Sequence, residues 1–221
     1  MPVRIIPKNY RSLTGLVLNS RTQSMTAFES SLERDFLLLL DFDLDVEFYE
    51  EQPVKIVYYD AKGRRRTYTP DVLVRYRTDP PQARHTKPLL CEVKYREDLP
   101  QHWVEYRPKF RAAGRYARQH GWRFRLVTER DIRTPYLDNV KFLRSYQTRA
   151  INESDRTRLL AALSALGETN PASLLNAISQ DRWQQAQMLP LLWQLIATRQ
   201  IRTDLSHPLT MRSPIELKES R

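Results

Sequence analysis

The residues best suited to chemistry are Pro70-Asp71 and, 21 residues later, Glu92-Val93-Lys94. On a β-strand, residues two apart point to the same face, so Glu92 and Lys94 would lie side by side. A preceding strand that opens at Asp71 can pair beside theirs and bring the second carboxylate near Glu92. Two carboxylates, with the Val93 carbonyl, form an oxygen site for a hard divalent cation such as Mg²⁺. Such a site is suited to phosphodiester hydrolysis, because the cation neutralises charge on the phosphate and lowers the pKa of a bound water.

The alternative for these residues is a set of salt bridges at a strand edge, which would contribute little to stability. The surrounding sequence favours the catalytic interpretation, since Glu92 and Lys94 interrupt an otherwise apolar strand over residues 89–95. A carboxylate and an ammonium on a central strand cost desolvation energy unless they are paired or bind a metal. Glu33, on a helix over residues 26–40, is a candidate fourth member of the site. A surface glutamate paired with a nearby arginine is the alternative for Glu33.

Two groups of arginines are candidates for contact with DNA phosphates. One is the run Arg64-Arg65-Arg66 at a predicted hairpin tip, and the other is a stripe on a helix over residues 101–120. The stripe comprises Arg107, Arg111, Arg115 and Arg118. A row of arginines on one helix can follow a phosphate backbone. It is also what an ordinary amphipathic helix presents to water. An apolar stripe from Trp103 to Ala117 should pack on a sheet.

The elements that position these residues are predicted from periodicity and turn signals. The predicted strands span residues 54–59, 68–77, 89–95 and 122–128. Thr26 and Glu29 have the capping-box spacing at the start of the first helix. Residues 1–25 are predicted to form a basic arm. The pattern indicates an α/β domain over residues 1–148.

A second, helical domain is predicted over residues 149–221. Its helices are predicted at residues 153–166, 171–178 and 182–198. Asn170-Pro171 is a cap followed by proline at the first helical position, and Pro190 should kink or split the third helix. A hairpin over residues 201–217 follows. Three helices and a hairpin is the order of a winged-helix module, although other small helical domains share that order.

Composition and charge narrow the classes of partner. Almost all of the net charge of +10 lies in the first two-thirds of the chain, as expected for a polyanion partner such as DNA, and the alternative is a solvated basic face. The longest apolar run, residues 36–40, is far shorter than the roughly 20 residues of a membrane span, and no signal peptide is recognisable. The single cysteine, Cys91, excludes an intramolecular disulfide. We therefore expect a cytoplasmic protein with no membrane partner.

Five segments, in this order, resemble the N-terminal endonuclease domain of TnsA, the endonuclease subunit of heteromeric bacterial transposases. They are Phe28 to Phe36, Glu51-Gln52-Pro53, Tyr68-Thr69-Pro70-Asp71, Glu92-Val93-Lys94 and Thr128 to Arg133. The resemblance covers roughly residues 1–145. It implies a PD-(D/E)xK core folded like a type II restriction endonuclease, to which the winged-helix-like domain would be attached.

The resemblance also implies an activity and partners. The implied activity is Mg²⁺-dependent cutting at the 5′ ends of a transposon, with Mn²⁺ as a substitute, while a separate DDE transposase cuts and joins the 3′ ends. Glu33, Asp71, Glu92 and Lys94 would be catalytic, and Val93 would join the three acidic residues as a metal ligand. Some members have glutamine where this chain has Glu92, and glutamate is the ordinary nuclease ligand. The C-terminal domain would contact an AAA+ ATPase regulator, and the protein would act on the bacterial nucleoid.

Two other functions remain compatible with the sequence. A standalone restriction or junction-resolving nuclease would share the catalytic residues but act without a transposase. A catalytically silent DNA-binding assembly factor would keep the fold without turnover, and the intact set of Asp71, Glu92 and Lys94 counts against it.

Overall fold

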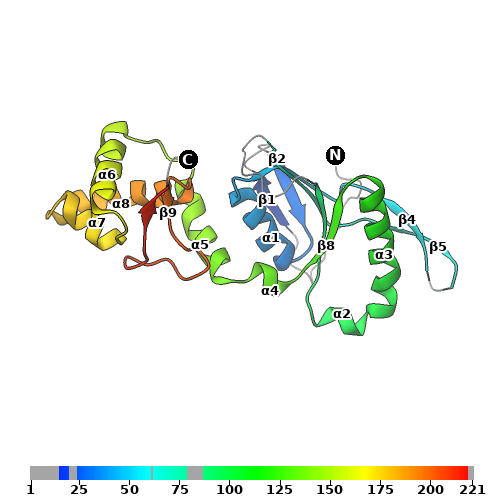
Figure 1. The fold of residues 1–221 in the computed structure, drawn as a ribbon. Coiled ribbons are helices and arrows are strands. Elements are labelled where there is room, and N and C mark those ends of the chain that lie inside the picture. The colour runs from blue at the N-terminus through cyan, green and yellow to red at the C-terminus, as the bar shows by residue number, and fades with distance from the viewer. Residues whose placement is uncertain (1–14, 20–23, 61, 79–86, 219–221) are drawn as a thin grey trace. The chain divides into compact units, whose positions relative to one another are not determined.

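The computed structural model describes residues 15–19, 24–60, 62–78 and 87–218, and the chain divides into two compact units, Met1–Arg133 and Thr134–Arg221. Figure 1 shows most of the strands in the first unit, whereas the second unit is mainly helical. The division lies earlier in the chain than the predicted boundary between residues 148 and 149.

The first unit is built on a four-stranded mixed sheet in the order β3-β6-β7-β8. Its strands are β3 (Val46–Glu51), β6 (Val72–Tyr76), β7 (Leu89–Val93) and β8 (Arg123–Val127). β3 and β7 both pair antiparallel with β6, whereas β8 runs parallel to β7. This arrangement confirms the predicted α/β class. The sequence does not predict β3, because three of its six residues are glutamate.

Strand β7 is the centre of this unit, and all five of its residues are buried. A continuous run of buried residues is typical of a strand covered on both faces. Helix α1 (Ser31–Phe42) packs on β3 and β7, and helix α3 (Trp103–Gln119) packs on β7 and β8. Figure 1 shows the two helices on opposite sides of the sheet. The charged residues at the end of β7 therefore lie between two packed layers.

Helix α3 provides the crossover that a parallel β7–β8 pair needs. It follows the short helix α2 (Asp98–Gln101) and is followed by Gly121, whose φ of 72° a glycine adopts readily. Ala113 and Ala117 are fully buried against Leu90 of β7. Trp103, which the predicted apolar stripe also includes, begins the helix and is 47% exposed, although it contacts Phe110 edge-on.

The N-terminal part of the chain differs from the prediction. Strands β1 (Gly15–Asn19) and β2 (Ser24–Phe28) pair antiparallel, so part of the predicted basic arm is a hairpin. Residues 1–14 and 20–23 lie outside the described residues. Because Thr26 belongs to β2, it does not cap the first helix. The N-cap of α1 is Ser30, whose Oγ accepts a hydrogen bond from the Glu33 backbone N–H at 3.1 Å.

The predicted strand over residues 68–77 is two strands in two different sheets. Strand β4 (Ile56–Tyr59) pairs antiparallel with β5 (Arg65–Tyr68), and this hairpin is separate from the four-stranded sheet. The chain leaves the hairpin at Pro70, which has no N–H to donate to a ladder. It enters β6 directly after Asp71.

The segment after β8 fixes helix α1 to the sheet. Helix α4 (Glu129–Ile132) begins with a capping box between Thr128 and Asp131. Directly after it, Arg133 donates from Nε to Asp35 Oδ2 at 3.1 Å and from Nη2 to Ser31 Oγ at 2.8 Å. The Asp35 side chain is only 3% exposed, so Arg133 neutralises a buried charge on α1. The segment from Thr128 to Arg133, one of the five that resemble TnsA, therefore has a structural role: it holds α1 in place.

The second unit is mainly helical. Its elements are α5 (Pro135–Leu143), η1 (Arg144–Tyr146), α6 (Glu153–Leu166), α7 (Pro171–Ile178), α8 (Arg182–Ala197), β9 (Ile201–Arg202) and β10 (Glu216–Leu217). The three predicted helices are confirmed, as is the Asn170 cap of α7. Pro190 does not split α8, which is continuous through it. The predicted hairpin is confirmed as the antiparallel pair β9–β10. Among the described residues, no helix is long and apolar enough to cross a membrane.

Helix α5 explains why the division falls before residue 148. Its side chains Leu137, Val140 and Leu143 are all buried. Phe142 packs edge-on against Trp193 of α8 at 5.4 Å between ring centroids. The Asn139 side-chain amide donates to the carbonyls of Leu205 and His207. Trp193 is thus a core residue, whereas Trp183 is 80% exposed.

We predict that Arg133→Ala destabilises the first unit, because it leaves the buried Asp35 carboxylate without one of its charged partners. The free energy of unfolding should fall by about 1–3 kcal/mol, and the melting temperature by roughly 2–4 °C per kcal/mol. Arg130→Ala is the matched control, since Arg130 is exposed on the same short helix. Equal melting temperatures for the two variants would contradict the role given to Arg133.

Candidate active site

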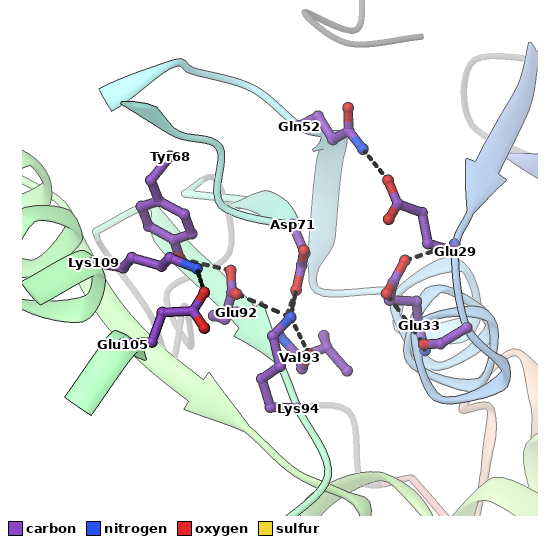
Figure 2. Close-up of polar contacts among 11 residues, drawn as sticks. Glu29, Glu33, Gln52, Tyr68, Asp71, Glu92, Val93, Lys94, Glu105 and Lys109 are labelled. Carbon is purple, nitrogen blue, oxygen red and sulfur yellow. Dashed lines mark hydrogen bonds and ion pairs between the residues drawn. The ribbon is translucent and has the colours of Figure 1, made fainter. Parts of the chain in front are cut away.

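The candidate site lies at one end of the four-stranded sheet, where several segments meet. The register places Glu51 opposite Val72, Val72 opposite Cys91, and Val93 opposite Val127. Consequently the end of β3, the start of β6 and the ends of β7 and β8 all lie at the same end. Figure 2 shows the polar side chains of this region together with those from the first turn of α1.

Asp71 is fixed to β7 by its backbone and its side chain. Its backbone N–H donates to the Cys91 carbonyl at 3.1 Å, which continues the β6–β7 ladder by one residue. Its Oδ2 accepts a hydrogen bond from the Val93 backbone N–H at 2.7 Å. The prediction that the strand opening at Asp71 pairs beside the strand of Glu92 is therefore confirmed.

Glu92 and Lys94 lie side by side, as their spacing predicts. The distance from Lys94 Nζ to Glu92 Oε1 is 3.0 Å, and to Asp71 Oδ2 it is 3.6 Å. Lys94 Nζ also donates to the Val93 carbonyl at 3.1 Å. One ammonium thus faces oxygens of Asp71, Glu92 and Val93, three of the four residues predicted to hold a metal (Figure 2).

Burial and mutual repulsion shift the pKa values of these groups. Burial raises the pKa of Glu92 to about 8, and the Asp71 carboxylate adds to the rise. Burial also raises the pKa of Asp71. For Lys94, burial disfavours the ammonium, but Asp71 and Glu92 outweigh it and raise its pKa above the ordinary value. The site therefore keeps a permanent positive charge beside carboxyls that hold protons more tightly than usual.

Glu33 enters the site from the first turn of α1. Its Oε2 accepts from the Glu29 backbone N–H at 2.8 Å, and its Oε1 accepts from Ser30 Oγ at 3.1 Å. Burial raises the pKa of Glu33 to about 7, followed by repulsion from Asp71. Glu33 is therefore an electrostatic neighbour of Asp71, and no surface arginine pairs with it among the described residues.

The donor set fits a hard divalent cation. Asp71, Glu92 and the Val93 carbonyl supply oxygens that already surround one positive charge, the Lys94 ammonium. Mg²⁺ prefers oxygen donors and is usually bound through one or two carboxylates. Within the described part of the chain, no three His, Cys, Asp or Glu side chains cluster closely enough to hold a metal ion by themselves. The Val93 backbone carbonyl would thus be needed beside Asp71 and Glu92 to complete a site.

Two buried residues support the site and are not among the predicted site residues. The Tyr68 hydroxyl donates to Glu92 Oε2 at 2.6 Å, and burial, followed by the Glu92 charge, raises its pKa far enough to keep it a neutral donor. The Gln52 backbone N–H donates to the Asp71 carbonyl at 2.7 Å, and its side chain donates to Glu29 Oε1 at 3.2 Å. Gln52 has a φ of 47°, which a residue other than glycine adopts rarely. Both residues belong to segments that resemble the TnsA pattern, which is the signal that could have singled them out.

The arginines predicted to contact DNA lie on exposed surfaces of the first unit. Arg65 and Arg66 are on β5, with Arg64 directly before it. The α3 stripe is exposed along its length, at Arg107, Arg111, Arg115 and Arg118. The structure places both groups on the surface, and their contact with DNA stays a prediction.

A mixed α/β unit with paired buried carboxylates and a lysine at one sheet end fits a nuclease. Comparison with protein families gives two matches: TnsA-like endonuclease N terminal over residues 43–129, and TnsA endonuclease C terminal over residues 131–205. The chain therefore belongs to the TnsA-like endonucleases, the DNA-cutting subunits of Tn7-type transposases. A search of curated proteins gives no match to the chain. The two family matches meet close to Arg133, where the two structural units divide.

The matched regions contain most of the candidate site. Asp71, Glu92, Val93 and Lys94 all lie within residues 43–129. Glu33 lies before the first match, so only the geometry of α1 and the resemblance of its segment support a role for it in the site.

We predict that the metal-free protein loses stability as the pH rises from about 4.5 to about 8. A carboxyl whose pKa is raised on folding stabilises the fold below its unfolded pKa, and this contribution is lost as the pH rises through the folded pKa. The pKa of Glu92 rises from 4.5 to about 8. Glu92→Gln can still accept a hydrogen bond from the Tyr68 hydroxyl. In this variant the decrease in melting temperature between these two pH values should therefore be smaller than in the wild type by several degrees.

The matched control for this measurement is Glu47→Gln, which makes the same change at an exposed position of β3. It should keep the wild-type dependence of melting temperature on pH. A Glu92→Gln profile that also parallels the wild type would show that Glu92 does not carry the effect.

Proposed function

We propose that this chain is a Mg²⁺-dependent endonuclease, with a PD-(D/E)xK core, that cuts the 5′ ends of a transposon during cut-and-paste transposition. Mn²⁺ would substitute for Mg²⁺. Its proposed partners are a DDE transposase, which processes the 3′ ends, and an AAA+ ATPase regulator. Its proposed location is the bacterial cytoplasm, on the nucleoid.

The observation that carries the proposal is the convergence of three oxygens on the Lys94 ammonium. Lys94 Nζ lies 3.0 Å from Glu92 Oε1, 3.6 Å from Asp71 Oδ2 and 3.1 Å from the Val93 carbonyl. Two carboxylates and a carbonyl surround this ammonium. The same oxygens are electrostatically suited to surround a metal cation. Asp71, Glu92 and Val93 would hold the metal, with Glu33 as an additional carboxylate.

A bound Mg²⁺ would neutralise charge on the scissile phosphate and lower the pKa of the attacking water. The residues of the chain would do the rest. Lys94 carries a permanent charge within reach of both carboxylates, so it can stabilise the negative charge that develops on the phosphate. The Val93 N–H orients Asp71, and the Tyr68 hydroxyl orients Glu92. These fixed hydrogen bonds reduce the reorganisation that the site needs on binding a cation.

We predict that Asp71→Ala and Glu92→Ala each reduce strand cleavage by at least about 100-fold, a loss typical when an electrostatic group of an active site is removed. The assay is mapping of breaks on a plasmid that carries the transposon ends, with Mg²⁺, with and without the transposase and the regulator. Glu97→Ala is the matched control, because Glu97 is an exposed carboxylate close to the site in sequence. Circular dichroism should show that each variant stays folded.

Each outcome of the plasmid assay has a distinct meaning. Breaks at the 5′ ends that need the partners and disappear in Asp71→Ala would support the proposed function. Breaks on bare DNA without partners would favour a standalone restriction or junction-resolving nuclease. Breaks that persist in Asp71→Ala would exclude the proposed site, and an absence of breaks under every condition would favour a DNA-binding assembly factor.

We also predict that the second unit recruits the ATPase regulator. Deletion of residues 151–221 would leave α5 in the chain without α8, on which Phe142 packs, so the cut is better placed after Arg133. A chain of residues 1–133 should stay folded and lose binding to the regulator in a pull-down. Unchanged binding by this truncated chain would contradict a recruiting role for the second unit.

A further inference from the structure

A groove of about 600 Å³ lies between the tip of the β4–β5 hairpin and the start of α3. Figure 1 shows the hairpin running past α3 in the first unit. Four lysine and arginine side chains line the groove, against two carboxylates: Lys62, Arg64, Arg66 and Lys109, against Asp60 and Glu105. The groove therefore has a positive balance of charge, and Thr67 and Gln101 add uncharged hydrogen-bonding groups.

The two arginines of the groove are held in place by one carboxylate. Asp60 Oδ2 accepts from Arg64 Nε at 2.9 Å and from Arg66 Nε at 3.1 Å. Asp60 Oδ1 accepts from the backbone N–H groups of Lys62 and Arg64. Within the described part of the chain, the terminal N–H groups of both guanidinium ions have no hydrogen-bond partner. Two pre-positioned guanidinium forks with unused donors are suited to phosphate oxygens.

Strand β5 connects the groove to a residue that supports the candidate active site. Arg66 and Thr67 line it, and the next residue, Tyr68, donates its hydroxyl to Glu92. At about 3.3 Å per residue of strand, Arg66 lies roughly 7 Å from Tyr68 along β5. That distance corresponds to about two base-pair steps along the axis of a DNA duplex.

We infer that this groove binds the phosphate backbone of the DNA strand beside the scissile phosphate, with Arg64 and Arg66 as the principal contacts. The inference rests on the proposed function, because it takes DNA as the substrate, and it names the surface that positions that DNA. It also divides the predicted DNA-binding residues. Arg65 lies next to Arg66 on the strand but does not line the groove, and neither does the arginine stripe of α3.

The test is DNA binding by the full chain carrying Asp71→Ala, which prevents cutting during the measurement. The probe is a fluorescently labelled duplex of random sequence, titrated at several salt concentrations. Arg66→Ala should weaken binding several-fold and lower the slope of log affinity against log salt by about one, the change expected for one lost phosphate contact. Arg65→Ala is the matched control, because it removes the same charge from the neighbouring position of β5, and it should change the slope clearly less.

Lys62→Ala tests whether weaker DNA binding could result from a disturbed hairpin and not from a lost positive charge. Lys62 is exposed, and its only hydrogen bond among the described residues is made by its backbone, so the substitution removes no side-chain contact. It should weaken binding in the same direction as Arg66→Ala, with an unchanged melting temperature.

Equal losses of DNA affinity in Arg65→Ala and Arg66→Ala would overturn the inference, and would show that binding depends on overall positive charge and not on the groove. Unchanged DNA binding in both Arg66→Ala and Lys62→Ala would also overturn it. If those variants bound DNA normally but lost binding to the transposase subunit, the groove would be a protein-binding surface instead. The assay measures DNA binding by a variant that cannot cut DNA. Failure of the cleavage proposal would therefore leave the binding result unaffected.

Discussion

A single ammonium allows two carboxylates to lie at the end of a buried strand. Without Lys94, Asp71 and Glu92 would place like charges together in a region from which water is largely removed, and each would require a partner. Lys94 lies within 4 Å of both. Burial raises the pKa values of Glu92 and Glu33, and repulsion from Asp71 adds to both rises. The divalent cation that we propose for this site would relieve that repulsion.

The position of that ammonium depends on the register of the sheet. A slip of one residue in β7 would move Glu92 and Lys94 to the opposite face. The Asp71 N–H to Cys91 carbonyl bond on one side, and the Lys94 N–H to Val127 carbonyl bond on the other, fix the end of β7. Arg133 then fixes α1, and with it Glu33, to the same end through Asp35 and Ser31. The side chains of the candidate site thus come from distant segments whose positions are set by backbone pairing and by one ion pair to a buried aspartate.

The sequence predicts those features that local spacing determines. Glu92 and Lys94 follow from the period of a strand, and the helices of the second unit follow from their caps, such as Asn170 before Pro171. The start of α1 is different, because Thr26-x-x-Glu29 and Ser30-x-x-Glu33 have the same capping spacing. Only the pairing of β2 with β1 decides between them, and that pairing is tertiary.

The contributions of Tyr68 and Gln52 do not follow from local spacing, for a related reason. The contact of Tyr68 with Glu92 joins a separate hairpin to the four-stranded sheet, and no periodicity within either segment reports it. Gln52 takes its backbone conformation from the turn between β3 and the next strand, where it also reaches Asp71. The division of the chain at Arg133 depends likewise on the packing of α5 against α8.

The only cysteine of the chain gives the site an internal reporter. Cys91 lies in β7 directly before Glu92 and is fully buried. Burial raises the pKa of its thiol to about 12, so the reactive thiolate is scarce while the strand is in place. A thiol reagent can modify the folded chain only when β7 separates from its neighbours. The rate of labelling would therefore measure how often the strand that carries Glu92 opens, and whether a bound cation or DNA keeps it closed.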